Sequence, residues 1–528
     1  MAQPKTDNDN AKKQSKLILN GDQLLYLEQS LSKYHHDHKS LNQDWQGFLQ
    51  GFDEADLIDD RPSWAKKPVK AWDDNFDQLL SANDVIVNPT EGMPENANSI
   101  KRDGTSEVTG LGNQAAEVAT YKFMRLVEGY RQRGHMLAQL DPLGLEQLAS
   151  PEQHSLTLES VNLTASELGL TLTDAAGVFS GKLIKDMVRQ LENTYSHNIG
   201  VEFSHITRNE ERQWLNNNFE SAEFREEFSR DQQHEFFQHV REAEMFEQFL
   251  HKKFRGDKRF SIEGGESAIL ALEMMLQYSS AAEVNEVVIG MAHRGRLNTL
   301  TKIMGKPYKA VLSEFKGNKP FPEEVAASGD VKYHSGFSND RDIKGKSLHL
   351  SLMCNPSHLE TVNPVVMGKV RSVQDVTGDH QRNHVMGLLI HGDAAFAGQG
   401  VVPESLELSE LDGYEIGGVM HLIINNQIGF TADVEKARKS RYPTELAKVI
   451  QAPIFHVNGD NPEAVVRVVK LACEYRVKFK RDVVINLVCY RKYGHNEGDE
   501  PNFTQPLMYQ KIKDHPSVTE IYAKIIEQ

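Results

Sequence analysis

The sequence predicts an α/β fold in which a parallel β-sheet is covered by helices on both faces. Short apolar runs recur through the second half of the chain, and each is separated from the next by a segment long enough for a helix or a loop. The runs are continuous rather than alternating, which is typical of strands buried on both faces. The runs are EVVIGM (286–291), LHLSLM (348–353), GLLI (387–390), HLIIN (421–425), IFHV (454–457) and VVINLVCY (483–490).

The composition is that of an ordinary globular protein. Hydrophobic residues make up 39% of the 528 residues and charged residues 25%, which excludes global disorder, a collagen-like chain and a coiled-coil rod. The formal net charge of −16 argues against nucleic acid as the main partner. The chain has 3 cysteines and no C-x-x-C pair, so we expect neither a disulfide framework nor a cysteine-type zinc site.

The first residues, MAQPKTDNDNAKKQSK, are polar and include acidic groups. They resemble neither a secretory signal nor a transit peptide, and no run approaches the ~20 apolar residues that span a bilayer. We therefore expect a cytoplasmic protein that does not interact with membranes.

The N-terminal 113 residues divide into two zones. Residues 1–52 place apolar side chains at helical spacing and predict two small helices. Residues 53–113 are rich in Asp, Asn, Pro and Gly, which indicates a flexible linker. His35, His36 and His38 lack a convincing metal-ligand spacing and are interpreted as a solvated helix face.

Two further zones follow. Residues 114–254 have a helical period and are expected to form a helical region largely free of strands. Residues 255–528 contain the apolar runs and form the predicted α/β domain. Within it, Asn461 and Pro462 predict a helix start, because asparagine caps helices and proline is favoured at the first helical position.

Every apolar run ends in small or polar residues. Ligands of such sheets gather at the carboxyl ends of the strands, so the site is expected there. Gly392-Asp393 and Asn425-Asn426 follow two of these runs. A carboxylate, an amide oxygen and a nearby backbone carbonyl can complete an octahedral Mg²⁺ site that also takes two diphosphate oxygens. Taken alone, either dipeptide would more often be a turn.

Several longer sequence segments resemble those of a known family. The Gly-Asp, interval, Asn-Asn arrangement resembles the fingerprint of thiamine diphosphate enzymes. The words AHRGRLN, GDVKYHSGF, NPSHLE, HGDAAFAGQG, NNQIGFT, APIFHVN and CYRKYGHNEGDEPNFTQPLMY closely resemble the first component of the 2-oxoglutarate dehydrogenase complex. The resemblance runs from about residue 121 to residue 509 and implies the thiamine diphosphate-binding fold for residues 255–528.

The resemblance implies roles for individual residues. Asp393 and Asn426 match the side-chain ligands of Mg²⁺, and Ile428 matches the residue that supplies a backbone carbonyl. Ala394 stands where many thiamine enzymes have a third glycine, which favours this branch of the family. The matches to other cofactor contacts are Arg294, Ser357, Leu359, Ala394 and Ala395.

Three histidines match catalytic positions. His293 and His334 match histidines that hold the 2-oxo acid, and His495 matches a histidine in a loop that closes over the site. Imidazoles suit this task because they change protonation near neutral pH. His358 and His391 border the predicted site, but the resemblance implies no specific role for them.

The implied activity is the thiamine diphosphate- and Mg²⁺-dependent oxidative decarboxylation of 2-oxoglutarate in a bacterial cytoplasm. The implied acceptor is the lipoyl group of dihydrolipoyl succinyltransferase, the core enzyme of a tricarboxylic acid cycle complex. Residues 1–52 resemble the segment that docks on that core. The complete enzyme is expected to be a homodimer.

Two alternatives remain open at this stage. A 2-oxoadipate dehydrogenase shares most of these words, and one methylene group is worth only about 1–3 kcal/mol of discrimination. A non-catalytic scaffold fragment is the other alternative, because in the family a pyrimidine-binding and a C-terminal domain follow. This chain stops at IYAKIIEQ, so we expect both domains and the pyrimidine-activating glutamate to be absent.

Overall fold

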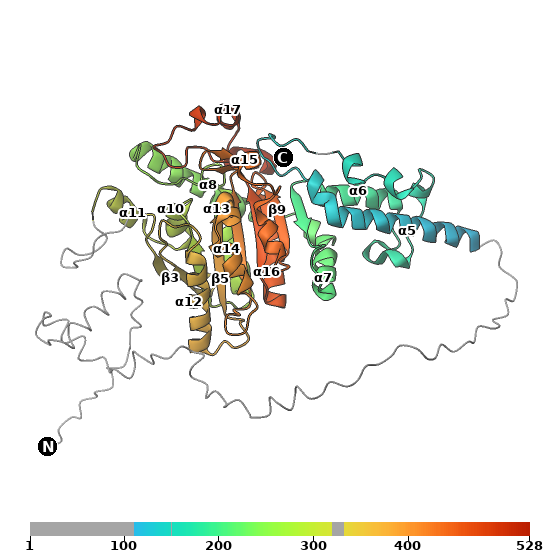
Figure 1. Ribbon diagram of the computed structural model, residues 1–528, viewed down its shortest axis with the longest axis horizontal. Helices are drawn as coiled ribbons and strands as arrows, with labels where there is room; N and C mark the ends of the chain where they lie inside the picture. Colours follow the sequence, from blue (N-terminus) through green and yellow to red (C-terminus); the bar gives the residue numbers. More distant parts are fainter. Residues whose placement is uncertain (1–109, 149, 319–331, 528) are drawn as a thin grey trace, which may run out of the picture.

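A computed structural model of the chain describes residues 110–148, 150–318 and 332–527. The predicted helices of residues 1–52 and most of the predicted linker lie outside the described residues. The described part is built around one eight-stranded sheet with the strand order β1-β9-β10-β6-β5-β2-β4-β3 (Figure 1). The strands are β1 (Ile199–Glu202), β2 (Glu286–Met291), β3 (Phe337–Ile343), β4 (Lys346–Leu352), β5 (Val385–Gly392), β6 (Val419–Asn425), β9 (Ile454–Asn458) and β10 (Val483–Val488).

The predicted parallel sheet is confirmed. The apolar runs of the sequence become β2, β4, β5, β6, β9 and β10, and every pairing among these strands is parallel. The residues of β2, β5, β6, β9 and β10 are almost all buried, as expected of strands covered on both faces, whereas β4 begins with two exposed residues.

Both edges of the sheet are antiparallel, which the sequence does not predict. β1 pairs with β9 and β3 pairs with β4. β3 is polar and half-exposed, and a hairpin through Lys344 and Gly345, both with positive φ, joins it to β4. β1 interrupts the zone that was expected to be largely helical, so residues 114–254 are joined to the sheet through a strand.

One face of the sheet carries α9 (Ser267–Ala281) and α16 (Pro462–Phe479), with α8 (Arg230–Lys253) packed against α9. α9 is buried along most of its length, because its sequence is apolar on all sides. The side chain of Asn461 accepts a hydrogen bond from the backbone N–H of Ala464, and Pro462 is the first residue of α16. The predicted start of this helix is therefore confirmed.

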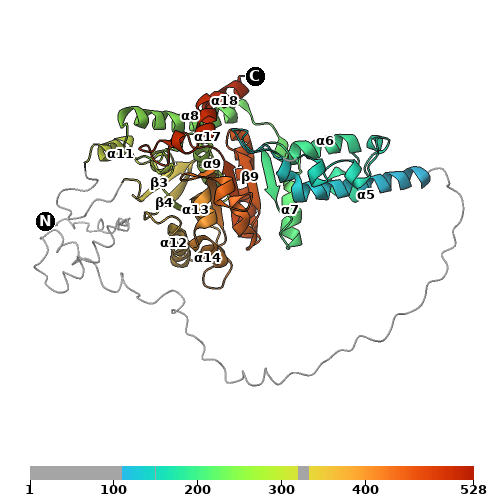
Figure 2. The ribbon, with the colours of Figure 1, turned by 45° about the horizontal axis from the view of Figure 1, so that its top comes forward.

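The other face carries α12 (Val362–Thr377), α13 (Asp393–Gly398) and α14 (Val401–Glu407). The helices α5 (Gly110–Arg133), α6 (Ile184–Tyr195) and α7 (Asn209–Phe219) gather beyond the edge strand β1, to the right of β9 in Figures 1 and 2. The remaining α-helices and short strands are α10 (Arg296–Asn298), α11 (Tyr308–Phe315), β7 (Ile428–Gly429), β8 (Ala432–Asp433), α15 (Val434–Ala437), α17 (Pro506–Asp514) and α18 (Val518–Ile526).

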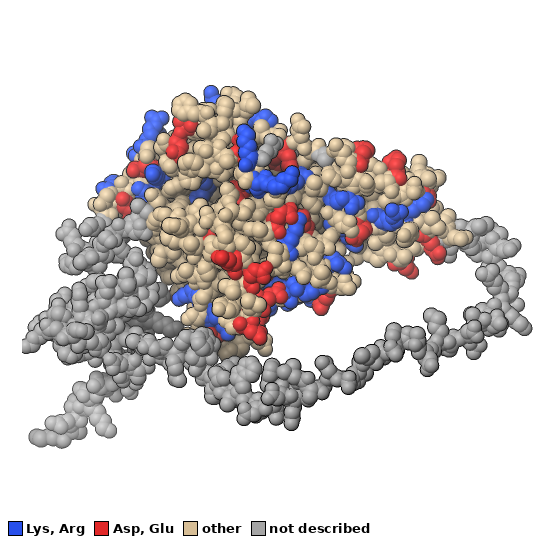
Figure 3. Space-filling model, viewed as in Figure 1, with Lys and Arg blue, Asp and Glu red and all other residues tan. Residues whose placement is uncertain are grey.

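Short helical turns complete the structure. They are η2 (Gly134–Leu137), η3 (Glu152–His154), η4 (Glu159–Val161), η5 (Glu167–Gly169), η6 (Asp174–Phe179), η7 (Glu223–Arg225), η8 (Thr299–Ile303), η9 (Pro443–Lys448) and η10 (Pro501–Phe503). Among the described residues, no helix is both long and apolar enough to cross a membrane. Acidic and basic side chains are interspersed over the face of the molecule in Figure 3.

Candidate active site

A cavity of about 470 Å³ opens at the carboxyl ends of β2, β5 and β6. Most of the site residues expected from the sequence line it: His293, Arg294, Leu359, Asp393, Ala394, Ala395, Asn426, Ile428 and His495. The other two, His334 and Ser357, connect to it through hydrogen bonds described below. The fold thus brings together residues from segments more than 200 positions apart, because neighbouring parallel strands end at one edge.

Asp393 lies at the turn from β5 into α13, and its side chain is buried. Its Oδ2 atom is 3.1 Å from Nη1 of Arg438, with which it forms an ion pair. Burial raises the pKa of Asp393, and the nearby guanidinium of Arg438 opposes that shift. The carboxylate therefore occupies a place that favours a cation beside it.

Asn426 follows β6 and lines the same cavity. Its Oδ1 atom is buried and has no hydrogen-bond partner among the described residues. Ile428, in β7, adds a backbone carbonyl to this part of the chain. A buried carboxylate, an unpaired amide oxygen and a backbone carbonyl are the oxygen ligands that Mg²⁺ prefers, so this donor set fits the ion.

The space beside these donors is kept open by small residues. A Cβ atom at Gly429 would lie 2.9 Å from Cβ of Ala394, so a side chain there would push β7 away from α13. Ala394 and Ala395 likewise leave the backbone of α13 accessible from the cavity. Such a cradle suits a diphosphate, which is bound through backbone N–H groups and a metal ion.

The predicted substrate histidines form a short chain. Nε2 of His293 is 2.9 Å from Nε2 of His334, and Oγ of Ser357 is 3.3 Å from the same His334 atom. His293 faces the cavity, whereas His334 is buried behind it. Burial, together with His334 and Arg296, lowers the pKa of His293 to about 4, so its imidazole is neutral at pH 7.

Arg296 fixes the segment that carries His334. Its guanidinium is fully buried and donates hydrogen bonds to the backbone carbonyls of Met291, Ser335 and Met353. These carbonyls come from the end of β2, the His334 segment and the end of β4. The arginine thus ties together three chain segments that meet at the cavity.

The loop with His495 is anchored beside the cavity by Arg294 and lies near His293, because Phe260 contacts both imidazoles. Arg294 donates one hydrogen bond to the carbonyl of His495 at 2.7 Å and another to that of Ser261 at 2.8 Å. The imidazole of His495 packs against the rings of Phe260 and Phe430. Arg294 therefore lines the cavity, but these two N–H groups donate to backbone carbonyls.

Glu497 provides the second anchor of this loop. Its carboxylate accepts hydrogen bonds from the backbone N–H groups of Arg259, Phe260 and Ser261. In Glu497→Gln an amide replaces one acceptor oxygen with a donor, so we expect a loss of about 1–3 kcal/mol of stability. Limited proteolysis should cut the 491–500 loop faster in this variant than in the wild type. Glu404→Gln, which changes an exposed carboxylate of α14 outside this loop, should leave that rate unchanged; equal rates in all three proteins would contradict the anchor.

Sequence reasoning missed several residues at the cavity. Phe260, Gln399, Phe430 and Arg491 line it, and Arg438 reaches it through its ion pair with Asp393. They lie in loops without a strand or helix pattern. Only the quoted segments that contain Gln399, Phe430 and Arg491 and resemble the family could have drawn attention to any of them.

His391 also borders the cavity, but both ring nitrogens are engaged elsewhere. Nδ1 is 2.5 Å from Oε2 of Glu360, and Nε2 is 3.0 Å from Nδ1 of His421. Nε2 of His421 is in turn 3.1 Å from Oδ1 of Asp482. This buried chain runs along the sheet, so His391 offers the cavity no free ring nitrogen.

The histidines predict a dependence of stability on pH. Burial, with Arg294 and Arg491 nearby, lowers the pKa of His495 from 6.5 to about 4. The unfolded chain therefore takes up a proton near pH 6.5 that the folded chain takes up only near pH 4, and stability falls as the pH decreases through this window.

The melting temperature of the wild type should fall between pH 7 and pH 5. We expect the melting temperature of His495→Gln to fall by a few degrees less. His197→Gln, which replaces an exposed histidine, should behave like the wild type. A wild-type loss no larger than that of His495→Gln would contradict this assignment.

The sequence was compared with a protein-family model and with curated proteins, and both comparisons give a match. The Dehydrogenase E1 component family model matches residues 239–528. The chain is 44% identical over 524 residues to the 2-oxoglutarate dehydrogenase E1 component of Rickettsia felis. This alignment covers 95% of this chain and 53% of the relative. It is 41% identical over 522 residues to the protein of the same name from Brucella anthropi, with 94% and 52% covered. The chain spans about half the length of these curated relatives.

Proposed function

Because the chain belongs to the Dehydrogenase E1 component family, we propose that its cavity binds thiamine diphosphate through Mg²⁺ and serves the decarboxylation of 2-oxoglutarate. The observation that carries this proposal is the convergence of Asp393 and the unpaired Oδ1 atom of Asn426 on one cavity. The names of the relatives support 2-oxoglutarate as the substrate.

In this proposal Asp393, Asn426 and the carbonyl of Ile428 would hold Mg²⁺, and Arg438 would then no longer be the charge partner of the Asp393 carboxylate. The backbone of Ala394 and Ala395, together with Leu359, contacts the cofactor. When bound, the thiazolium ring accepts the electron pair released on decarboxylation.

The remaining groups of the cavity suit a dicarboxylate substrate. Arg294 and Arg491 supply positive charge at the cavity wall, which favours an anionic ligand. We propose that neutral His293, oriented by its hydrogen bond with His334, donates or accepts a proton at the substrate. His495 covers the cavity from its loop and excludes water.

The proposal extends to partners of the complete enzyme. The acceptor of the acyl group is the lipoyl domain of a dihydrolipoyl succinyltransferase, residues 1–52 dock on its core, and two copies of the complete protein form a dimer. Removing residues 1–52 should spare cofactor binding and abolish co-purification with the core. Unchanged co-purification would contradict the docking role.

The function is tested by calorimetric titration of the full chain with thiamine diphosphate. We expect binding with Mg²⁺, much weaker binding with a chelator, and none of thiamine without its diphosphate. For the complete enzyme, the CO₂ released from 2-oxoglutarate and from 2-oxoadipate then compares the two substrates, with kcat/KM expected about 10-fold or more in favour of 2-oxoglutarate. Equal binding of thiamine and thiamine diphosphate would contradict the site; a preference for 2-oxoadipate would contradict only the substrate.

A further inference from the structure

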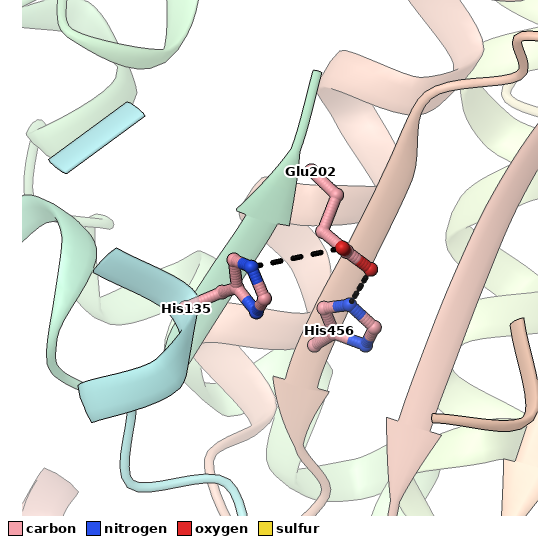
Figure 4. A group of neighbouring side chains, drawn as sticks. All are labelled: His135, Glu202 and His456. Atoms are coloured by element: carbon pink, nitrogen blue, oxygen red, sulfur yellow. Dashed lines mark hydrogen bonds and ion pairs between the residues drawn. The ribbon is translucent and has the colours of Figure 1, made fainter. Parts of the chain in front are cut away.

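A second cluster of ligand-type side chains lies away from the cavity. His135, Glu202 and His456 are all buried, with exposed fractions of 7%, 8% and 0%. Each residue offers one ligand atom, a ring nitrogen or a carboxylate oxygen, and these three atoms lie within 4.8 Å of one another. Figure 4 shows both imidazoles directed at the carboxylate of Glu202, His135 from η2 and His456 from β9. The cluster therefore spans the junction between the helical region and the sheet.

The backbone brings these residues together at the sheet edge. In the β1–β9 ladder, Gly200 is paired with His456, so Glu202 and His456 lie on neighbouring strands. A Cβ atom at Gly200 would lie 3.0 Å from Cβ of His135. The absence of a side chain at Gly200 thus allows η2 to pack closely on β1 and to place His135 beside Glu202.

The tautomer of His135 follows from its contacts. The hydroxyl of Tyr442 donates to the carbonyl of His135 at 3.1 Å, so its oxygen accepts a hydrogen bond from Nδ1 of the same residue at 3.2 Å. Nε2 then carries a lone pair and lies 3.6 Å from Oε2 of Glu202.

His456 has a similar supporting residue. Its Nδ1 atom is 2.9 Å from the side-chain amide nitrogen of Asn486, the residue paired with it on β10. The Oδ1 atom of Asn486 is buried without a partner among the described residues. Turning this amide over would let Oδ1 accept a hydrogen bond from Nδ1–H of His456 and would leave Nε2 with a lone pair toward Glu202, 3.0 Å from Oε1. Second-sphere partners orient metal-ligating histidines in this way.

One cation already competes for the carboxylate. Nζ of Lys448 is 2.6 Å from Oε2 of Glu202 and 2.8 Å from Oε2 of Glu445. The lysine side chain is partly exposed, so it can move into solvent while the three buried residues stay in place. A metal ion bound here would replace the lysine as the charge partner of Glu202.

We propose that His135, Glu202 and His456 form a binding site for a divalent ion of the zinc type, in competition with Lys448. Two imidazole nitrogens and one carboxylate are the ligands that Zn²⁺ and Co²⁺ favour, whereas Mg²⁺ prefers oxygen ligands. The ion would link η2 and β1 to β9, and it would stabilise the attachment of the helical region to the sheet. This site is independent of the function proposed for the cavity.

The test uses the metal-free full chain, with Co²⁺ as a visible probe and excess Mg²⁺ present to occupy oxygen sites. We expect one Co²⁺ per chain, with the absorption bands of a four- or five-coordinate ion that has nitrogen ligands. His456→Gln should abolish these bands, and Lys448→Met should tighten Co²⁺ binding by about tenfold or more, because the competing charge is gone. Zn²⁺ should displace the Co²⁺ and raise the melting temperature of the wild type.

Two controls separate this site from other histidines. His197→Gln removes an exposed histidine near β1, and a triple glutamine variant removes His35, His36 and His38, which lie outside the described residues. Both should retain the bands. Bands that vanish in the triple variant, no stoichiometric binding, or unchanged affinity in Lys448→Met would overturn the proposal. The Lys448→Met result remains decisive even if His456→Gln does not fold, because Lys448 is partly exposed.

Discussion

Asp393→Asn is expected to weaken the binding of thiamine diphosphate in the presence of Mg²⁺ by about 100-fold or more. The substitution keeps the size of the side chain but removes the negative charge that attracts the metal ion. It also leaves the largely buried guanidinium of Arg438 without its ion-pair partner. The measurement is calorimetric titration of the variant and the wild type at one Mg²⁺ concentration.

A matched control distinguishes a metal ligand from a general effect of charge. Asp412→Asn makes the same chemical change at an exposed position outside the cavity and should leave the affinity unchanged. Melting curves of both variants establish that the chain is folded. Equal affinities of Asp393→Asn and the wild type would show that the cofactor binds without this carboxylate.

Arg296→Met is expected to have the largest effect on stability, with a loss of about 3–5 kcal/mol. The variant removes a buried guanidinium and leaves the carbonyls of Met291, Ser335 and Met353 without their donor. Burial lowers the pKa of Arg296 to about 9, so the wild-type side chain is charged at pH 7 and its bonds to carbonyls are charge-assisted. Denaturant unfolding measures the loss.

Two companion variants make this prediction specific. Arg296→Lys retains the charge but lacks the planar fork that reaches three carbonyls, so its loss should be intermediate. Arg189→Met, at an exposed position of α6, should change the unfolding midpoint little. An Arg296→Met midpoint equal to that of Arg189→Met would contradict the bridging role.

The central strands could be predicted from the sequence because burial on both faces leaves a clear signal, a continuous apolar run. The edges could not. β3, with the sequence FSNDRDI, is polar since solvent reaches it, and β1 has only four residues, IGVE. Their positions depend on pairing with β4 and β9, which is a property of the folded chain.

The candidate site was predictable to a similar degree. Asp393 and Asn426 directly follow strands, so the position of the strands predicts that they meet at one edge. The supporting residues carry no such signal. Arg438 lies 45 residues from its partner Asp393, and Glu497 lies 237 residues from Phe260, so only the three-dimensional structure brings them together.

The same reason explains the second cluster. Adjacent histidines at 35, 36 and 38 are visible in the sequence but have no ligand spacing. His135, Glu202 and His456 are separated by up to 321 residues and meet only because β1 pairs with β9. Metal ligands contributed by separate strands leave no local pattern in the sequence.

The most direct test of the central claim is a crystal structure of the chain with thiamine diphosphate and Mn²⁺, an anomalous scatterer that replaces Mg²⁺ at oxygen sites. The account predicts one anomalous peak within bonding distance of a carboxylate oxygen of Asp393, Oδ1 of Asn426 and the carbonyl of Ile428, with Arg438 turned away from Asp393 and the diphosphate beside Ala394. A diphosphate bound elsewhere, or a peak that does not contact Asp393 and Asn426, would contradict it.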